Sequence, residues 1–318
     1  LGYFQYPAPT RVTVPANLVK AGPNQIAIRL SSQWGGAQIV GNPPSFVLEA
    51  PNGGFKLSLA TTWEMKEDLE PIPAAIPFYV NQPSFLFNGM VNPVIPYAIK
   101  GFIWNQGEAD ASRPALYTRL FTRLIGDWRK LWEDGQLPFL FVQGSNAYNT
   151  HEFDRRSFTK SYLREAQAKA LALNGTGMIV SVDIGDPYDV HPKNKQDYGN
   201  RLALQALKKV YGKNVVADGP ACRSWHISGD TLVICLDRPS NEVVMRMDNP
   251  SDCCFELATR AGQFYPAKAV LKGSEIHVFS DQVRSPAEMR YAWGDNPCVC
   301  VFDKTGLPMA PLRISIAR

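Results

Sequence analysis

The segment 183–195 gathers three carboxylates and a histidine, a combination suited to acid–base chemistry. Asp186 and Asp189 precede His191, and the chain has only four histidines. An imidazole titrates near neutral pH, and a neighbouring carboxylate fixes its tautomer, so such a pair can form a general base. A lone His-Pro is more often an ordinary surface feature. The loop therefore becomes a candidate site only in combination with a second motif.

The second motif is Asn-Gln-Gly-Glu-Ala-Asp at 105–110. The Gln106 side-chain amide can donate a hydrogen bond to a developing oxyanion, and Gly107 lets backbone and ligand approach closely. Glu108 can hold the loop by accepting backbone hydrogen bonds. Taken alone, Gln106 would be an ordinary residue at the start of a helix. The two motifs together combine a candidate general base, His191, with a candidate oxyanion donor, Gln106.

Both motifs directly follow apolar runs of the kind that form buried parallel strands. The carboxyl ends of parallel strands meet at one edge of a sheet, where open α/β proteins place their chemistry. Amphipathic segments alternate with these runs, and Pro114 fits the first turn of a long helix capped by Ser112 or Asp110. We expect strands at 99–104, 138–143 and 177–182, and helices from Pro114 towards Gly135, at 162–173 and at 196–211. Three successive βα units predict a parallel sheet covered on both faces.

The pattern changes twice along the 318 residues, which predicts three regions. Residues 1–75 alternate as β-strands do, for example at 10–15 and 24–30, and predict part of an inserted β-sandwich-like domain that could bind carbohydrate. Residues 76–220 hold the α/β segment. Residues 221–318 consist of short alternating runs and predict a C-terminal antiparallel β-domain.

Composition excludes several classes of function. The net charge is +4, and no basic run with interleaved aromatic residues supports nucleic-acid binding. No apolar run reaches the roughly 18 residues of a membrane span. All six cysteines follow residue 221 without CxxC or histidine spacing, so we expect no metal and no cofactor. Disulfides are possible, but the sequence cannot pair the cysteines.

Seven stretches from about residue 83 to the end resemble the sialate O-acetylesterase family within the SGNH (GDSL-like) hydrolases. These stretches are Phe87–Met90, Ile103–Glu108, Leu124–Arg129 with Trp132, Leu163–Gln167, Asp183–Arg201, Phe264–Lys268 and Arg290–Trp293. The first 75 residues are more faintly similar to the β-domain inserted into the catalytic domain of this family.

The resemblance implies an α/β SGNH-hydrolase (flavodoxin-like) three-layer sheet, incomplete here, between an N-terminal β-domain piece and a C-terminal β-domain. It implies a serine esterase outside the cytoplasm that removes acetyl groups from sialic acid or another acetylated glycan, with no metal. His191 matches the catalytic base and Gln106 the oxyanion donor. The family places an aspartate three residues before the histidine, where this chain has Tyr188, so Asp189 and Asp186 are the nearest substitutes.

The nucleophile departs from the family pattern. The family serine lies in a Gly-Gln-Ser-Asn-type segment near the first strand, and no such segment precedes the predicted sheet here. We therefore expect the serine to lie outside this chain, in an N-terminal segment or a subunit. Ser145, which directly follows the 138–143 strand, is the alternative within the chain. The rival function is that of a non-catalytic glycan-binding or scaffold protein. A conventional lipase is a weaker rival, because this sequence contains no Gly-x-Ser-x-Gly motif.

Overall fold

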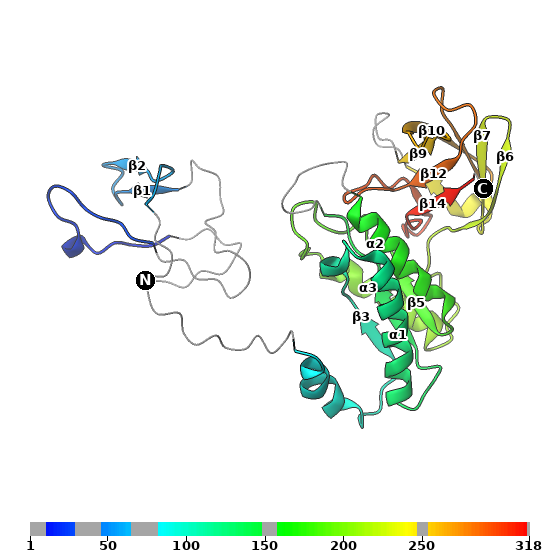
Figure 1. Cartoon of the computed structure of the whole chain (residues 1–318), viewed down its shortest axis with the longest axis horizontal. Helices are drawn as coiled ribbons and strands as arrows, with labels where there is room; N and C mark the ends of the chain where they lie inside the picture. Colours follow the sequence, from blue (N-terminus) through cyan, green and yellow to red (C-terminus); the bar gives the residue numbers. More distant parts are fainter. Residues whose placement is uncertain (1–10, 29–45, 65–81, 148–157, 247–253, 317–318) are drawn as a thin grey trace. The chain divides into compact units, whose positions relative to one another are not determined.

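The computed structural model describes residues 11–28, 46–64, 82–147, 158–246 and 254–316. The chain divides into two compact units, residues 1–78 and residues 79–318. The protein is a mixed α/β molecule with several sheets (Figure 1). Within the described residues, no helix is long and apolar enough to cross a membrane.

The first unit contains little regular structure among its described residues. Strands β1 (Val47–Glu49) and β2 (Lys56–Ser58) pair antiparallel, and a short 3-10 helix spans Ala16–Leu18. The strands predicted at 10–15 and 24–30 are wrong over residues 11–15 and 24–28, which form no strand. None of the described residues of this unit is buried, so apolar alternation alone does not fix strands there. The β-sandwich-like domain predicted for residues 1–75 stays a prediction.

The second unit contains three parallel strands in the order β3-β4-β5. Their bounds are β3 (Phe102–Trp104), β4 (Phe139–Val142) and β5 (Thr176–Ile179). The helices between and after them are α1 (Pro114–Leu131), α2 (Thr159–Ala168) and α3 (Lys195–Lys209). The alternating strand–helix order and the parallel pairing predicted from the sequence are confirmed, with shorter strands than expected.

Alternation along β4 divides the core of this region between the two faces of the sheet. Phe139 and Phe141 pack with the buried face of α1 and with Leu163 of α2. Val142 packs instead with Tyr198 of α3. This is the period-two pattern of a strand covered on both sides. Helices α1 and α2 therefore cover one face, and α3 covers the other.

Helix α1 begins at the proline that the sequence indicated, but not with the predicted cap. Pro114 occupies the first turn, where its missing N–H is no loss. The N-cap residue is Arg113, and no side chain caps the helix, so the prediction of Ser112 or Asp110 as cap is wrong. Asp110 lies instead in the preceding 3-10 turn and binds the Arg113 guanidinium at 2.7 Å.

The C-terminal part contains a seven-stranded antiparallel sheet with the order β14-β12-β9-β10-β11-β7-β6. Its strands are β6 (Cys222–Ser228), β7 (Thr231–Leu236), β9 (Phe255–Ala258), β10 (Phe264–Lys272), β11 (Glu275–Phe279), β12 (Glu288–Tyr291) and β14 (Leu312–Ser315). A separate pair joins β8 (Val243–Met245) to β13 (Val301–Asp303). The predicted antiparallel pairing is present.

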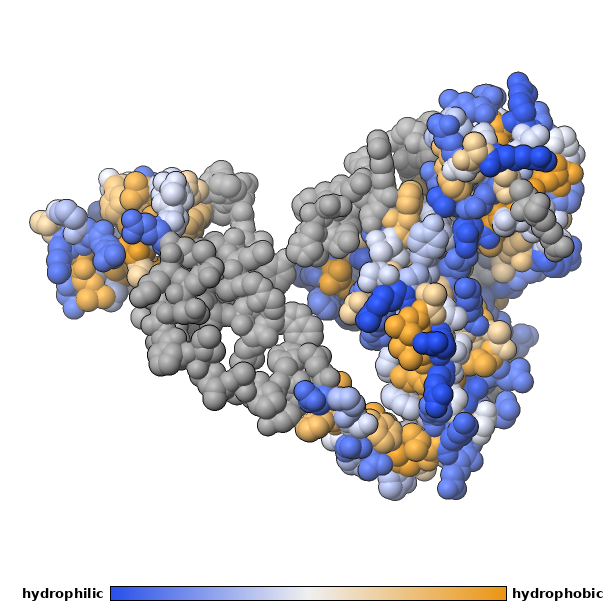
Figure 2. All heavy atoms as spheres, viewed as in Figure 1, coloured by the Kyte–Doolittle hydropathy of each residue, from blue (hydrophilic) through white to orange (hydrophobic). Residues whose placement is uncertain are grey.

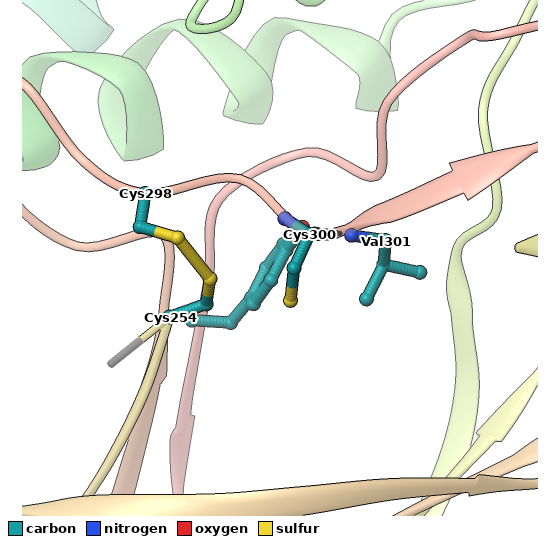
Figure 3. Close-up of a disulfide and its surroundings, with 5 residues drawn as sticks. Cys254, Cys298, Cys300 and Val301 are labelled. Carbon is teal, nitrogen blue, oxygen red and sulfur yellow. Dashed lines mark hydrogen bonds between the residues drawn. A yellow bond between two sulfur atoms is a disulfide. The ribbon is translucent and has the colours of Figure 1, made fainter. Parts of the chain in front are cut away.

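A disulfide between Cys254 and Cys298 ties the start of β9 to the segment after β12 (Figure 3). Cys300 beside it is a buried free thiol. The buried Tyr291 hydroxyl accepts the backbone N–H groups of Cys300 at 3.3 Å and Val301 at 3.0 Å. These contacts fix the path of the chain between β12 and β13.

Candidate active site

A pocket of about 270 Å³ lies at the carboxyl ends of β3 and β4. It is formed by the loop after β3, the loop after β4, and the segment that leads into α3. Its lining residues are Asn105, Gln106, Glu108, Ser145, Val190, His191, Pro192, Lys195 and Tyr198. The structure thus brings the two predicted motifs together at one edge of the parallel sheet, and adds Ser145 to them.

The His191 loop is organised by its own aspartates. Asp189 Oδ1 accepts the backbone N–H of His191 at 2.8 Å and lies 3.8 Å from its Nδ1. Asp186 Oδ1 accepts the N–H of Tyr188 at 2.9 Å, so this carboxylate stabilises the turn. Of the two predicted candidates for the acid, Asp189 is therefore the one beside the imidazole. The His191 side chain is 88% exposed, so a ligand can reach it.

Two polar contacts fix the ends of this loop. Asp183 binds Arg201 of α3 through two contacts of 2.6 Å, a bidentate pair. Asn194 caps α3 by accepting the N–H of Asp197 at 3.3 Å. The histidine loop therefore runs between two anchored points, which limits how far His191 can move.

The Gln106 loop is held through its backbone. The Gln106 carbonyl accepts Tyr117 Oη at 2.9 Å and Gln167 Nε2 at 3.2 Å. Gly107 has φ +157°, and a Cβ there would lie 2.8 Å from Gln167 Nε2, so both the backbone conformation and the neighbouring side chain favour glycine. The close approach of a ligand predicted for Gly107 stays a prediction. Glu108 was predicted to hold the loop; Tyr117 and Gln167 do so instead, and Glu108 lines the pocket.

The Gln106 side chain donates from Nε2 to Asp110 Oδ2 at 3.3 Å. This contact is long for a charge-assisted hydrogen bond, so the amide can be turned towards a ligand at little cost. The amide is thus available to an oxyanion in the pocket. The role of Gln106 as oxyanion donor is compatible with this geometry and stays a prediction.

Ser145 follows β4 and is 8% exposed. The Ser145 and Ser181 hydroxyls lie near the phenol of Tyr198, whose pKa is raised by burial and lowered in part by these two neighbours. Ser181 itself donates to the Gln143 carbonyl at 2.6 Å. The pocket therefore contains a hydroxyl, an imidazole, a carboxamide and a phenol. The first three are groups that can serve as nucleophile, general base and oxyanion donor in ester hydrolysis.

Sequence reasoning missed Lys195 and Tyr198, which line the pocket from the first turns of α3. The Lys195 ammonium lies 5.4 Å from the centre of the Tyr198 ring. Their three-residue spacing puts them on one face of α3, but the helix predicted from the sequence begins only at residue 196. Across the described ranges, no group of three or more His, Cys, Asp or Glu side chains could hold a metal ion.

Known proteins match this chain at the site region. The family model for carbohydrate esterases described as sialic acid-specific acetylesterase matches residues 79–208. A sialate O-acetylesterase of Mus musculus is 28% identical over 68% of this chain and 43% of its own length. One from Homo sapiens is 26% identical over 93% of this chain and 58% of its own. The chain thus spans about half the length of these curated relatives.

A solved structure agrees with these sequence matches. The crystal structure of a carbohydrate acetylesterase from Xanthomonas citri superposes with a TM-score of 0.68 at 35% identity, over 73% of this chain and 54% of that one. The matched region contains all three segments that line the pocket. Residues 79–208 of this chain are thus similar to the carbohydrate esterases described as sialic acid-specific acetylesterases.

Proposed function

We propose that this protein is a carbohydrate O-acetylesterase that uses a serine nucleophile and His191 as its base. The observation that carries the proposal is the shared pocket, which places the His191 imidazole and the Gln106 carboxamide together at the carboxyl edge of the sheet. The names of the relatives, sialate O-acetylesterases and a carbohydrate acetylesterase, support the reaction class.

In the reaction, His191 accepts the proton of the serine hydroxyl as the oxygen attacks the acetyl carbonyl. Gln106 donates to the oxyanion of the tetrahedral intermediate, and His191 then protonates the leaving sugar oxygen. An acetyl-serine remains, and water activated by His191 releases acetate and restores the serine. Asp189, beside Nδ1, orients the imidazole and stabilises its cationic form.

The serine has two alternative sources. Ser145 lines the pocket and needs no partner. A serine from a segment beyond these 318 residues is the other source. In its support, the edge of β3 opposite β4 has no partner strand among the described residues, and Ile103, on the face of β3 opposite α1, is 67% exposed. A parallel strand added at this edge would end beside Asn105 and Gln106, next to the pocket.

The segment that leads into β3 also exposes apolar side chains, and hydrophobic surface lies along it in Figure 2. Met90 is 68% exposed and Tyr97 is 74% exposed. Exposed apolar side chains beside an open strand edge favour coverage by further polypeptide. For this reason we favour the external serine over Ser145, together with an SGNH-type three-layer fold completed by that strand.

The substrate we propose is an acetyl ester of sialic acid or of another glycan. A pocket of about 270 Å³ is near the lower limit for small-molecule sites, which are roughly 300–1,000 Å³. It suits a small acyl group, with the sugar remaining near the open side where His191 is exposed. By the same family similarity we propose a location outside the cytoplasm.

The test measures hydrolysis of p-nitrophenyl acetate and acetate release from O-acetylated sialic acid by the 318-residue chain, alone and with the upstream segment added. His191→Ala and Ser145→Ala are the variants, and His226→Ala on strand β6 is the matched control. If the chain alone is active and both His191→Ala and Ser145→Ala abolish its ester hydrolysis, Ser145 is the nucleophile.

Activity that appears only with the added segment, and that is lost in His191→Ala but not in Ser145→Ala, would identify the external serine. Full activity in His191→Ala would overturn the mechanism. A folded protein that is inactive in both forms but binds acetylated sialic acid would support a non-catalytic glycan-binding protein instead.

A further inference from the structure

Helix α2 buries a polar face between the active-site loops and the C-terminal β-sheet. Lys160, Ser161, Arg164 and Gln167 are each at most 7% exposed. Burial lowers the pKa of Arg164 to about 10, so its guanidinium is still charged at neutral pH. A buried charge must be matched by hydrogen-bond acceptors. The acceptors of Arg164 therefore show what this helix holds in place.

Arg164 binds two segments that are far apart in the sequence. Its guanidinium donates to the carbonyls of Gly144 at 2.7 Å and Ser145 at 2.8 Å, in the loop after β4. It also donates to the carbonyls of Gly294 at 2.6 Å and Asp295 at 2.9 Å, in the turn after β12. The pocket loop and the C-terminal turn are thus fixed to the same side chain.

Lys160 and Asp295 add contacts between the same two segments. The Lys160 N–H donates to Asp295 Oδ1 at 2.8 Å, and its ammonium donates to the Ala147 carbonyl at 2.9 Å. The Ala147 N–H in turn donates to the Asp295 carbonyl at 3.2 Å. Since Asp295 is only 2% exposed, these hydrogen bonds are shielded from water. Their donors and acceptors must therefore be well aligned, because water cannot replace a missing partner.

The Asn146 side chain extends this connection to the histidine loop. Asn146 Nδ2 donates to Asn296 Oδ1 at 2.9 Å, and Asn146 Oδ1 accepts the Gly185 N–H at 2.8 Å. A Cβ on Gly185 would lie 2.6 Å from the Asn146 carbonyl oxygen, so the two loops are in close contact. Gly185 belongs to the loop that carries His191. One carboxamide therefore bridges the C-terminal turn and the histidine loop.

We propose that Asn146 is a positioning residue of the active site, through which the 294–296 turn of the C-terminal β-domain sets the place of the His191 loop. The inference rests on the proposed esterase function for its kinetic consequence. Arg164 and Lys160 hold the turn, and Asn146 transmits its position to Gly185. Asn146 itself is not among the residues that line the pocket.

The test compares Asn146→Ala, Asn146→Asp and a control, Asn174→Ala, in which an exposed asparagine before β5 is truncated. Asn146→Ala should lower kcat by about 10- to 100-fold with a smaller change in KM, because small misplacements of a catalytic group are costly. The Gly185 amide should exchange with deuterium at least roughly tenfold faster, because its acceptor is gone. Asn174→Ala should change neither quantity.

Asn146→Asp keeps an acceptor for the Gly185 N–H, and Asn296 can turn its amide to donate to the new carboxylate. This variant should recover most of kcat and the slow Gly185 exchange. Unchanged kcat and unchanged Gly185 exchange in a folded Asn146→Ala protein would overturn the inference.

The exchange measurement needs no activity and separates the two proposals. A parent protein that is inactive both alone and with the upstream segment added would refute the esterase function, while Gly185 exchange would still decide whether Asn146 holds the loop. An active parent whose Asn146→Ala variant exchanges faster at Gly185 without losing kcat would refute the positioning role alone.

Discussion

The Asp189 carboxylate contacts two atoms of His191, accepting its backbone N–H at 2.8 Å and lying 3.8 Å from its Nδ1. Asp186, the other aspartate of the loop, accepts the N–H of Tyr188 instead. One carboxylate thus lies beside the imidazole and holds the His191 backbone, and the other stabilises the turn before it. The two aspartates are therefore separable by substitution.

Asp189→Asn should reduce kcat for acetyl-ester hydrolysis by about 10- to 100-fold. This is less than the roughly 10⁴-fold loss known for a buried triad aspartate, because the Asp189 side chain is 29% exposed and water screens the pair. Steady-state kinetics measure the change. Asp186→Asn is the matched control, since its amide oxygen still accepts the Tyr188 N–H. A larger loss of kcat in Asp186→Asn than in Asp189→Asn would show that Asp186, and not Asp189, is the acid that supports His191.

Gln106→Ala should lower kcat by about 100- to 1,000-fold, the usual effect of removing one oxyanion donor. KM should change little, because the hydrogen bond forms fully only in the transition state. Gln136→Ala, in the exposed turn before β4, is the control. A raised KM with kcat unchanged would show that Gln106 binds the ground state and is no oxyanion donor.

Removal of the disulfide should destabilise the second unit. The bridge between Cys254 and Cys298 spans 44 residues of sequence, and the loop-entropy relation gives about 4 kcal/mol for a loop of that size. Cys298→Ser should lower the free energy of unfolding in urea by up to about this amount. Cys222→Ser, a free thiol on β6, is the control. Equal stability of the two variants would show that the bridge contributes nothing.

Asp218 should make stability depend on pH in acid. Burial opposes its ionisation, but hydrogen bonds from Lys208 and Gln205, each 2.6 Å long, outweigh this and lower the pKa below 3.8. When the pKa of a carboxyl group is lower in the folded than in the unfolded protein, its ionised form stabilises the fold. This stabilisation is complete above the unfolded-state pKa and is lost as the pH falls through the folded-state pKa. The free energy of unfolding should therefore decrease below about pH 4.

Urea unfolding between pH 7 and pH 3 measures this decrease. Asp218→Asn should be less stable at pH 7 and should show a flatter profile in acid. Asp230→Asn is the control, because Asp230 lies 3.4 Å from Arg284 on an exposed surface. An unaltered profile in Asp218→Asn would assign the acid dependence to other carboxylates.

Much of the α/β region was predictable because its signals are local. Apolar runs before Gln106 and His191 marked strands, and Pro114 marked the start of α1. The N-terminal strands were not predictable in the same way, because alternation at 24–28 is not accompanied by burial in the described residues. The N-cap of α1 was missed because Asp110 binds Arg113 instead of the helix N-terminus.

The site was predictable as two motifs but not as a network. Gln106 and His191 each stood out by residue type beside a strand end, and the structure places them in one pocket. The contacts of Asn146 with Asn296 join residues 150 positions apart, and no spacing in the sequence indicates such a pair. Choosing Asp189 over Asp186 also required the turn geometry, because both lie near His191 in sequence.

The complete burial of Arg164 limits how this protein can be taken apart. Its guanidinium is bonded on one side to the α/β region and on the other to the sheet that begins at β6. Truncation of the chain between α3 and β6 would remove half of the hydrogen-bond acceptors of this cation and would leave it at a newly exposed surface. The two sheets are thus not interchangeable modules. Shortened or chimaeric versions should carry helix α2 and the 294–296 turn as an inseparable pair.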